Sequence, residues 1–154
     1  MGPAPHLYVD ADACPVKTEV LRVAARHALR VTLVARTWMR VPADDRVRLE
    51  VVAEGFDAAD DWIAEHVAPG DIVVTADIPL ASRCLARGAA AVGTTGRPFT
   101  EDNIGEAMAT RALLSDLRGA GEWTRGPAAF APRDRSRFLQ SLEDAVQAAL
   151  RGRR

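Results

Sequence analysis

The sequence has few of the features that mark secreted or membrane proteins. Only two of its 154 residues are cysteines, Cys14 and Cys84, which are too few and too far apart for a disulfide framework or a zinc ribbon. Its apolar runs are much shorter than the roughly 20 residues of a membrane span, and no signal-peptide pattern opens the chain. We therefore expect a cytoplasmic protein that is not associated with a membrane.

The chain also lacks an excess of either charge. It has 20 basic and 21 acidic residues, for a net charge of −1, so any nucleic-acid binding must come from a local basic patch. Aromatic residues make up 5%, which argues against a surface that stacks many bases. With 48% hydrophobic residues, the chain is long and apolar enough to fold, and we expect a single domain over residues 1–154.

Short apolar runs alternate with helical patterns along the chain. The runs predict strands over 6–10, 31–35, 47–53, 71–75 and 89–92. Apolar residues at helical spacing predict helices over 15–28, 57–67, 79–88, 100–117 and from about 134. Thr100 and Asp134 are predicted to cap the last two of these helices. This alternation predicts an α/β fold of three layers, α/β/α, with a mostly parallel central sheet and a C-terminal helical extension from about 134. Residues 36–46 are predicted to form a loop, and residues 118–133 come closest to a linker.

Aspartates follow two of the predicted strands. Asp10 ends the first strand, Asp12 lies two residues later, and Asp77 follows the strand at 71–75. Because ligands bind beyond the carboxyl ends of parallel strands, these three side chains are expected to converge. A second acidic group, Asp57, Asp60 and Asp61, lies on one face of a predicted helix, opposite its apolar stripe.

Carboxylates held close together repel one another unless a cation lies between them, and oxygen ligands suit Mg²⁺ or Mn²⁺. Such a cation polarises a phosphoryl oxygen and activates a water molecule for attack on phosphorus. We therefore predict a site in which Asp10, Asp12 and Asp77 are catalytic. Its predicted metal ligands are Asp10, Asp57, Asp60, Asp61 and Asp77.

A structural role is the alternative for most of these aspartates. Asp12 and Asp77 each precede a helix that opens with proline, where a carboxylate commonly caps the helix. The acids of the middle helix fit a solvated face equally. Asp10 is harder to explain in this way, because it ends an apolar strand and needs a partner if it is buried.

Four further residues are candidates for substrate binding. Lys17 lies in the first turn after Pro15 and is a candidate phosphate ligand, although an exposed lysine is the alternative. Thr75 either binds a phosphate or a water molecule, or ends its strand. Asn103 either lines a cleft or caps a helix. Arg135 belongs to a basic cluster that either contacts nucleic-acid backbone or is solvated surface.

Five ordered blocks resemble the YaiI/YqxD family of uncharacterised bacterial proteins. They are DADACPVK at 10–17, DAADDWI at 57–63, DIVVTADIPLA at 71–81, TEDNI at 100–104 and DRSRFL at 134–139. The family looks like a branch of the PIN-like nucleases, which have a parallel sheet and an acidic site for Mg²⁺ or Mn²⁺, and many of which cleave RNA. The resemblance implies that Asp10 and Asp77 match the strand-end acids, and that the helix acid is among Asp57, Asp60 and Asp61.

Three functions remain open at this point. The first is a metal-dependent nuclease acting on RNA or single-stranded nucleic acid. The second is a phosphatase of the haloacid-dehalogenase type, because Asp10-Ala11-Asp12 imitates its nucleophile motif, although Cys14 and the early position of Asp60-Asp61 depart from its pattern. The third is a non-catalytic module that binds metal, RNA or a protein.

Overall fold

A single sheet organises the chain in the computed structural model, which describes residues 4–12, 14–53, 55, 57–119 and 130–152. Within these residues the sheet has six strands in the order β3-β2-β1-β4-β5-β6. The strands are β1 (Leu7–Asp10), β2 (Val31–Ala35), β3 (Val47–Val51), β4 (Ile72–Val74), β5 (Ala90–Val92) and β6 (Pro98–Phe99). The helices are α1 (Lys17–Arg26), α2 (Ala58–His66), α3 (Ile78–Ala86), α4 (Glu101–Gly119) and α5 (Pro132–Arg151).

The prediction of a mostly parallel α/β sheet is confirmed. β1 pairs in parallel with β2 on one side and with β4 on the other, and β5 is parallel to β4. Every residue of β2 and β4 is buried, as expected for continuous apolar strands that are covered on both faces. The predicted strands and helices are all present, with ends that differ by a few residues.

The sequence did not reveal β6. This strand has two residues, pairs with β5 in antiparallel orientation and begins with a proline. Two residues carry no detectable periodicity, and a proline normally argues against a strand, although an edge position tolerates it. The linker predicted over 118–133 falls largely on residues 120–129, which lie outside the described residues.

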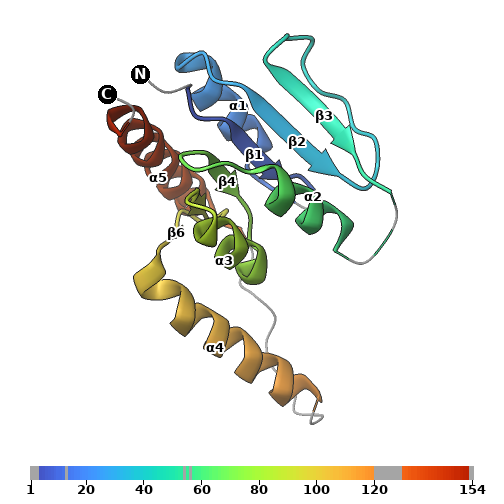
Figure 1. Cartoon of the computed structure of the whole chain (residues 1–154), viewed down its shortest axis with the longest axis vertical. Helices are drawn as coiled ribbons and strands as arrows, with labels where there is room; N and C mark the ends of the chain where they lie inside the picture. The colour runs from blue at the N-terminus through green and yellow to red at the C-terminus, as the bar shows by residue number, and fades with distance from the viewer. Residues whose placement is uncertain (1–3, 13, 54, 56, 120–129, 153–154) are drawn as a thin grey trace.

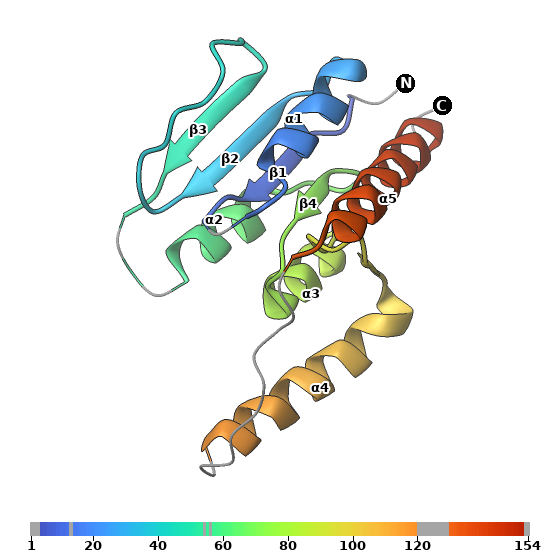
Figure 2. The ribbon, with the colours of Figure 1, turned by 180° about the vertical axis from the view of Figure 1, so that it is seen from behind.

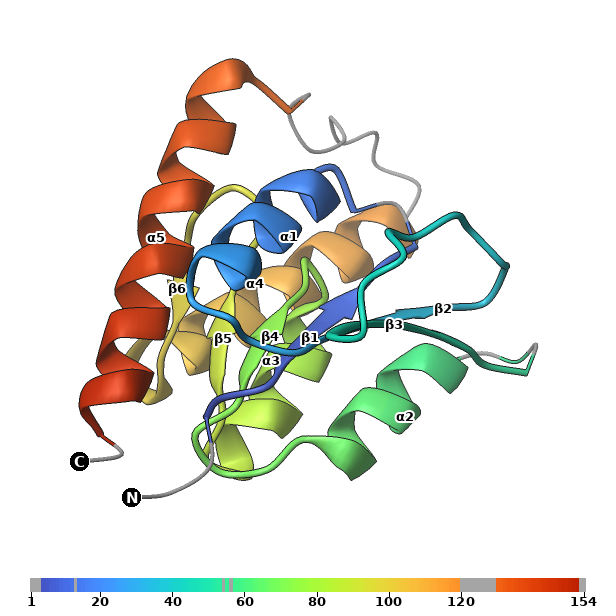
Figure 3. The ribbon, with the colours of Figure 1, turned by 90° about the horizontal axis from the view of Figure 1, so that it is seen from above.

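Helices cover both faces of the sheet (Figure 3). On one face, Leu7, Val9 and Leu33 pack with apolar residues of α1 and α5. On the other, Tyr8 and its neighbouring strand residues pack with α2 and α3. Alternate side chains of β1 therefore point to opposite faces of the sheet, as the pleat of a strand requires.

The C-terminal helix α5 belongs to this core. Phe138, Leu142 and Val146 are fully buried at a spacing of four residues. Arg135, near the start of α5, pairs with Glu19 near the start of α1, and Glu143 pairs with His27 just after the end of α1. The two helices therefore run in the same direction, and α5 ends beside the amino ends of the strands, close to where β1 begins (Figures 1 and 3).

Helix α4 projects away from the rest of the molecule (Figures 1 and 2). Near its start, Ala107 packs with Ala81 of α3 and with Phe99 of β6. Farther along, Leu113 is 59% exposed, and Met108 and Leu114 are also exposed. No described helix has the length and apolar character needed to cross a bilayer.

Two of the predicted helix caps, Asp12 and Asp134, are wrong. Asp12 does not cap α1, which begins at Lys17 without a side-chain cap. Pro15 lies in a turn ahead of this helix rather than in its first turn. Asp134 lies inside the first turn of α5 and accepts a hydrogen bond from the backbone N–H of Ala131. The predicted caps Asp77 and Thr100 are confirmed, since Asp77 accepts from Leu80 N–H and Thr100 accepts from Asn103 N–H.

Candidate acidic site at the carboxyl ends of the strands

The acidic site lies where the strand order of the sheet reverses. From β1 the chain continues to β2 and β3 on one side, whereas β4 and β5 extend the sheet on the other. Asp10 is the last residue of β1, and Asp77 follows β4 by three residues. Because β1 and β4 are parallel neighbours, their carboxyl ends bring the two aspartates to one edge, the usual ligand position of such sheets.

Thr75 links the two strand ends. Its hydroxyl donates to Asp10 Oδ2 at 2.9 Å and accepts from the backbone N–H of Asp77 at 2.9 Å. The side chain is 1% exposed, so these bonds replace bonds to water. Thr75 was predicted as a substrate ligand, and in the structure its hydroxyl instead positions the acids.

Asp77 has both a structural and an electrostatic role. Its Oδ1 accepts from the backbone N–H of Leu80 at 2.9 Å, and it thereby caps α3, which has Pro79 in its first turn. The same side chain is also hydrogen-bonded to the carboxyl group of Asp60. The capping interpretation of Asp77 is therefore correct, and it does not remove the residue from the acidic site.

Asp60 comes from the first turn of α2 and has the strongest shift among these acids. Burial, followed by repulsion from Asp77 and Asp10, raises its pKa to about 7. Burial also raises the pKa of Asp10, against the opposing effect of the Thr75 hydrogen bond. In the protein without a cation, Asp60 therefore loses its proton near neutral pH rather than near pH 4, at a site where several carboxylates meet.

Asp12 and Asp57 lie at the rim of a cavity of about 270 Å³ that is also lined by Asp10, Asp60 and Arg36. Asp12 accepts from the backbone N–H of Arg36 at 3.0 Å, and the Arg36 Nε lies 3.9 Å from the same oxygen. Asp57 is exposed and has a φ of 65°, the left-handed conformation that redirects the chain into α2. The cavity thus combines four acids from two segments with one arginine.

Asp61, the remaining predicted metal ligand, lies away from this cluster. Its Oδ1 pairs with Arg83 of α3 at 2.8 Å, and its side chain is 55% exposed. One residue along a helix rotates the side chain by about 100°, so Asp60 and Asp61 face different neighbours. The structure therefore distinguishes three helix acids that the sequence left equivalent, with Asp60 in the cluster, Asp57 at the rim and Asp61 outside.

The predicted substrate ligands Lys17, Asn103 and Arg135 are not part of the acidic cavity. Lys17 Nζ donates to the carbonyl oxygens of Ala11 and Cys14. Asn103 accepts from Thr100 N–H and donates to the Pro98 carbonyl, so it secures the start of α4. Arg135 pairs with Glu19 and lies over the ring of Phe130.

Arg36 is the site residue that the sequence did not reveal, because it lies in a predicted loop without a motif. It follows β2 directly, and β2 is the parallel neighbour of β1. The rule that located Asp10 and Asp77 also applies to this position. Its signal was therefore its place after a buried strand rather than its residue type.

The donor set of the cluster suits a hard divalent cation. All of its acidic ligands are carboxylate oxygens, and Mg²⁺ in particular binds through few carboxylates and keeps several waters. Within the described residues, no group of three or more His, Cys, Asp or Glu side chains is arranged so that it could hold a metal ion. Cation binding at this place therefore requires that the Asp60 proton be displaced and that the side chains adjust.

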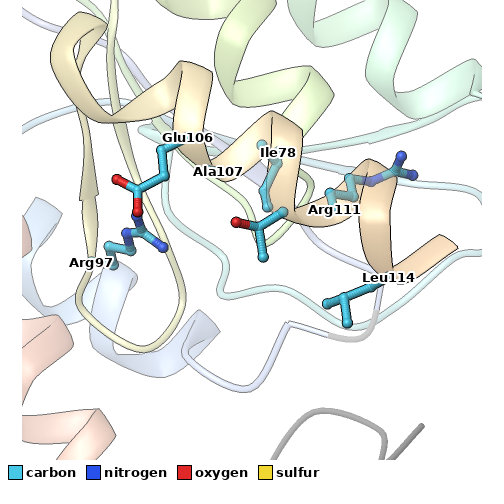
Figure 4. Close-up of a pocket in the computed structure, with 7 residues that line it drawn as sticks. Ile78, Arg97, Glu106, Ala107, Arg111 and Leu114 are labelled. Atoms are coloured by element: carbon cyan, nitrogen blue, oxygen red, sulfur yellow. The ribbon is translucent and has the colours of Figure 1, made fainter. Parts of the chain in front are cut away.

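A second cavity, of about 340 Å³, lies under α4 (Figure 4). Its lining includes Ile78 of α3, Ala107 and Leu114 of α4, and Arg97 before β6. In Figure 4 the side chains of Arg97 and Glu106 point toward one another at one end of the cavity. Its lining contains no cluster of acids.

Fold and site together define a single α/β domain with an acidic cluster at the switch point of its sheet. The profile of the YaiI/YqxD family, described as uncharacterized, matches residues 8–148. The chain therefore belongs to the YaiI/YqxD family.

Curated relatives agree over nearly the full length of the chain. A UPF0178 protein of Rhodospirillum rubrum is 60% identical over 96% of this chain and 99% of the relative. A UPF0178 protein of Rhodopseudomonas palustris is 58% identical over 96% of this chain and 94% of its own length. A UPF0178 protein of Bradyrhizobium is 54% identical over 96% of this chain and 90% of its own length.

Proposed function

We propose that the chain is a phosphodiesterase that depends on Mg²⁺ or Mn²⁺ and cleaves RNA or single-stranded nucleic acid. The observation that carries this proposal is the meeting of Asp10, Asp60 and Asp77, which come from three different elements. Burial, followed by repulsion from Asp77 and Asp10, raises the pKa of Asp60 to about 7. Carboxylates held this close destabilise the protein when no cation is bound, so their proximity is expected at a cation site.

Five residues of the acidic site have distinct roles in this proposal. Asp10 and Asp77 hold the cation, and Asp60 joins them once it has lost its proton. When bound, the cation supplies Lewis-acid stabilisation of a phosphoryl oxygen and lowers the pKa of water. Arg36, a positive charge at the rim of the cavity, attracts and orients the phosphate diester. Asp12 fixes the backbone of Arg36.

The resemblance to PIN-like nucleases supports the same reaction, because those proteins carry acids at the carboxyl ends of a parallel sheet. Fold-level likeness is a weak warrant for function, so the aspartates rather than the topology are the basis of the proposal.

Thermal unfolding with and without millimolar Mn²⁺ or Mg²⁺ is the direct test of the cation site. At a cation concentration 100 times the Kd, we expect the Tm of the wild type to rise by about 5–10 °C. Asp10→Asn and Asp77→Asn abolish most of this rise. Asn remains a good N-cap, so Asp77→Asn removes the charge while it preserves the cap of α3. Asp61→Asn is the matched control and retains the wild-type rise.

Cleavage of labelled single-stranded RNA and DNA then tests the reaction. Cleavage that requires Mg²⁺ or Mn²⁺ and is lost in Asp10→Asn supports the proposal. Cleavage that persists in that variant contradicts it. An aspartyl-phosphate trapped on Asp10 assigns phosphatase chemistry instead, and binding of RNA without cleavage under any of these cations assigns a binding module.

A further inference from the structure

A groove of about 670 Å³ lies between α1 and the loop that follows β2. Its floor is apolar and consists of Leu21 of α1, Leu33 of β2, and Met39 and Val41 of the loop. Its volume falls within the range of roughly 300–1,000 Å³ that is typical of pockets for one small ligand. This apolar groove is separate from the acidic cavity.

The rim of the groove is basic. Lys17 and Arg22 of α1 line one side, and Arg40 of the loop lines the other. The chain as a whole has a net charge of −1, so this local concentration of positive charge does not reflect an overall basic composition. An apolar floor between basic side chains suits a ligand that has a flat apolar part and also carries negative charge.

The loop after β2 contributes residues to both the groove and the acidic cavity. Arg36, which opens the loop after β2, lines that cavity, and Arg40 of the same loop lines the groove. Lys17 lines the groove and bonds the carbonyl of Ala11, the residue between Asp10 and Asp12. The groove and the acidic cavity are therefore neighbours, and they share the loop after β2.

Trp38 lies in the same loop, next to Met39 of the groove floor, and is 74% exposed. An indole that remains in water offers a surface for stacking a base. Aromatic residues make up 5% of the chain, which favours recognition of one base over a row of stacked bases. This combination points to a nucleotide rather than to an acidic peptide, because a peptide of acidic residues has no flat apolar group for the floor.

We propose that this groove binds one unpaired nucleotide of a single-stranded nucleic acid, next to the phosphate that lies at the aspartates. The proposal rests on the proposed function, and it adds where the strand is held. The base lies on the floor formed by Leu21, Leu33 and Met39. The adjoining phosphates lie against Lys17, Arg22 and Arg40.

Fluorescence anisotropy with a labelled single-stranded RNA hexamer tests this assignment at low salt and in EDTA, so that binding is measured without cation-dependent cleavage. The groove variant is the double substitution Arg22→Glu, Arg40→Glu. Its matched control is Arg30→Glu, Arg46→Glu, which makes the same charge change at exposed residues before β2 and β3. All four positions are exposed, and the Tm of each variant confirms that it folds.

We expect the groove variant to bind the hexamer at least about tenfold more weakly, and the control to bind within about twofold of wild type. A hexamer with the same backbone but without bases binds wild type about tenfold more weakly, because base stacking contributes strongly to such complexes. A Met39→Asp variant discriminates less between the two hexamers.

Equal binding by the groove and control variants overturns the proposal. So does equal affinity for the abasic hexamer, or for an acidic hexapeptide of the same charge. Cleavage with Mn²⁺ by a wild type that does not bind the hexamer in EDTA overturns the groove but leaves the proposed function intact. Groove-dependent binding without cleavage under Mg²⁺ or Mn²⁺ supports the groove and contradicts the hydrolytic function.

Discussion

When no cation is bound, the ionisation of Asp60 destabilises the folded protein, and this effect depends on pH. Its pKa is raised from 3.8 to about 7 by burial and by Asp77, Asp10 and Asp57. Between these two pH values the folded state binds more protons than the unfolded state, so stability falls as the pH rises. Above pH 7 the folded protein carries the full repulsion.

We therefore predict that Asp60→Asn stabilises the metal-free protein at pH 8 but has little effect at pH 4. Because Asp60 is partly exposed and solvent screens the repulsion, we expect a gain of about 1 kcal/mol, or ~2–4 °C in Tm. Thermal unfolding in EDTA across pH 4–8 measures this gain, with Asp61→Asn as the control. A gain that is equal at both pH values contradicts the assigned repulsion.

The Thr75 hydroxyl donates a hydrogen bond to the Asp10 carboxylate and accepts one from the Asp77 N–H. We predict that Thr75→Val, which keeps the shape of the side chain, lowers the free energy of unfolding by about 1–3 kcal/mol. Thr75→Ser retains the hydroxyl and loses less. Urea unfolding measures both variants, and equal stability of Thr75→Val and wild type would show that water replaces the hydroxyl.

Residue type and position after a strand were sufficient to predict Asp10 and Asp77 as neighbours. They were not sufficient for Asp60 and Asp61, which are adjacent in sequence and alike in chemistry. Only the packing of α2 against α3 turns one toward Asp77 and the other toward Arg83. Asn103 lies outside the acidic cavity for a related reason, since polar side chains commonly bond nearby backbone and the sequence does not show those bonds.

At the scale of elements, the contact between α1 and α5 includes a buried acid. Glu19 is 3% exposed and pairs with Arg135. We predict that Arg135→Ala destabilises the protein by about 1–3 kcal/mol, because a buried carboxylate then loses its charged hydrogen bonds. Arg133→Ala, at an exposed position in the first turn of α5, is the control and changes stability little.

Urea unfolding of these two variants, together with hexamer binding, separates the roles of Arg135. A structural role lowers stability and leaves the affinity for the hexamer unchanged. Lower affinity at unchanged stability would instead support the original prediction that Arg135 contacts a substrate.

The elements themselves were predictable because most are long and strongly patterned. The largely apolar run at 31–35 and the buried stripe of α5 left few alternatives. The approach of Gly96 to α5 was not predictable. A Cβ built at Gly96 would lie 2.6 Å from the Arg137 carbonyl carbon, so this close contact depends on how the loop after β5 meets a helix 40 residues later.

At the scale of the whole molecule, stability is distributed unevenly. The central strands β1 and β4 are covered on both faces, whereas α4 projects from the body and, among the side chains that the structure describes, buries little beyond Ala107. Segments with few buried apolar contacts open more readily than the core. The molecule is therefore expected to lose α4 before it loses the sheet.

We predict that amide hydrogens in the second half of α4 exchange at least about 100-fold faster than those of β1 and β4 under native conditions. Hydrogen–deuterium exchange read by mass spectrometry measures this difference, with α5, another long helix, as the internal reference. Equal protection of α4 and α5 would mean that a second molecule or another segment covers α4 in solution.

Helix α5 ends near the start of β1, beside the amino ends of the strands, whereas the aspartates lie at the carboxyl ends. A short linker that joins these two ends would therefore produce a circular permutant without crossing the acidic cavity. New ends opened between residues 42 and 46, in the loop before β3, would interrupt neither a helix nor a strand. Such a permutant, or a probe attached at either present end, leaves the mouth of the cavity accessible.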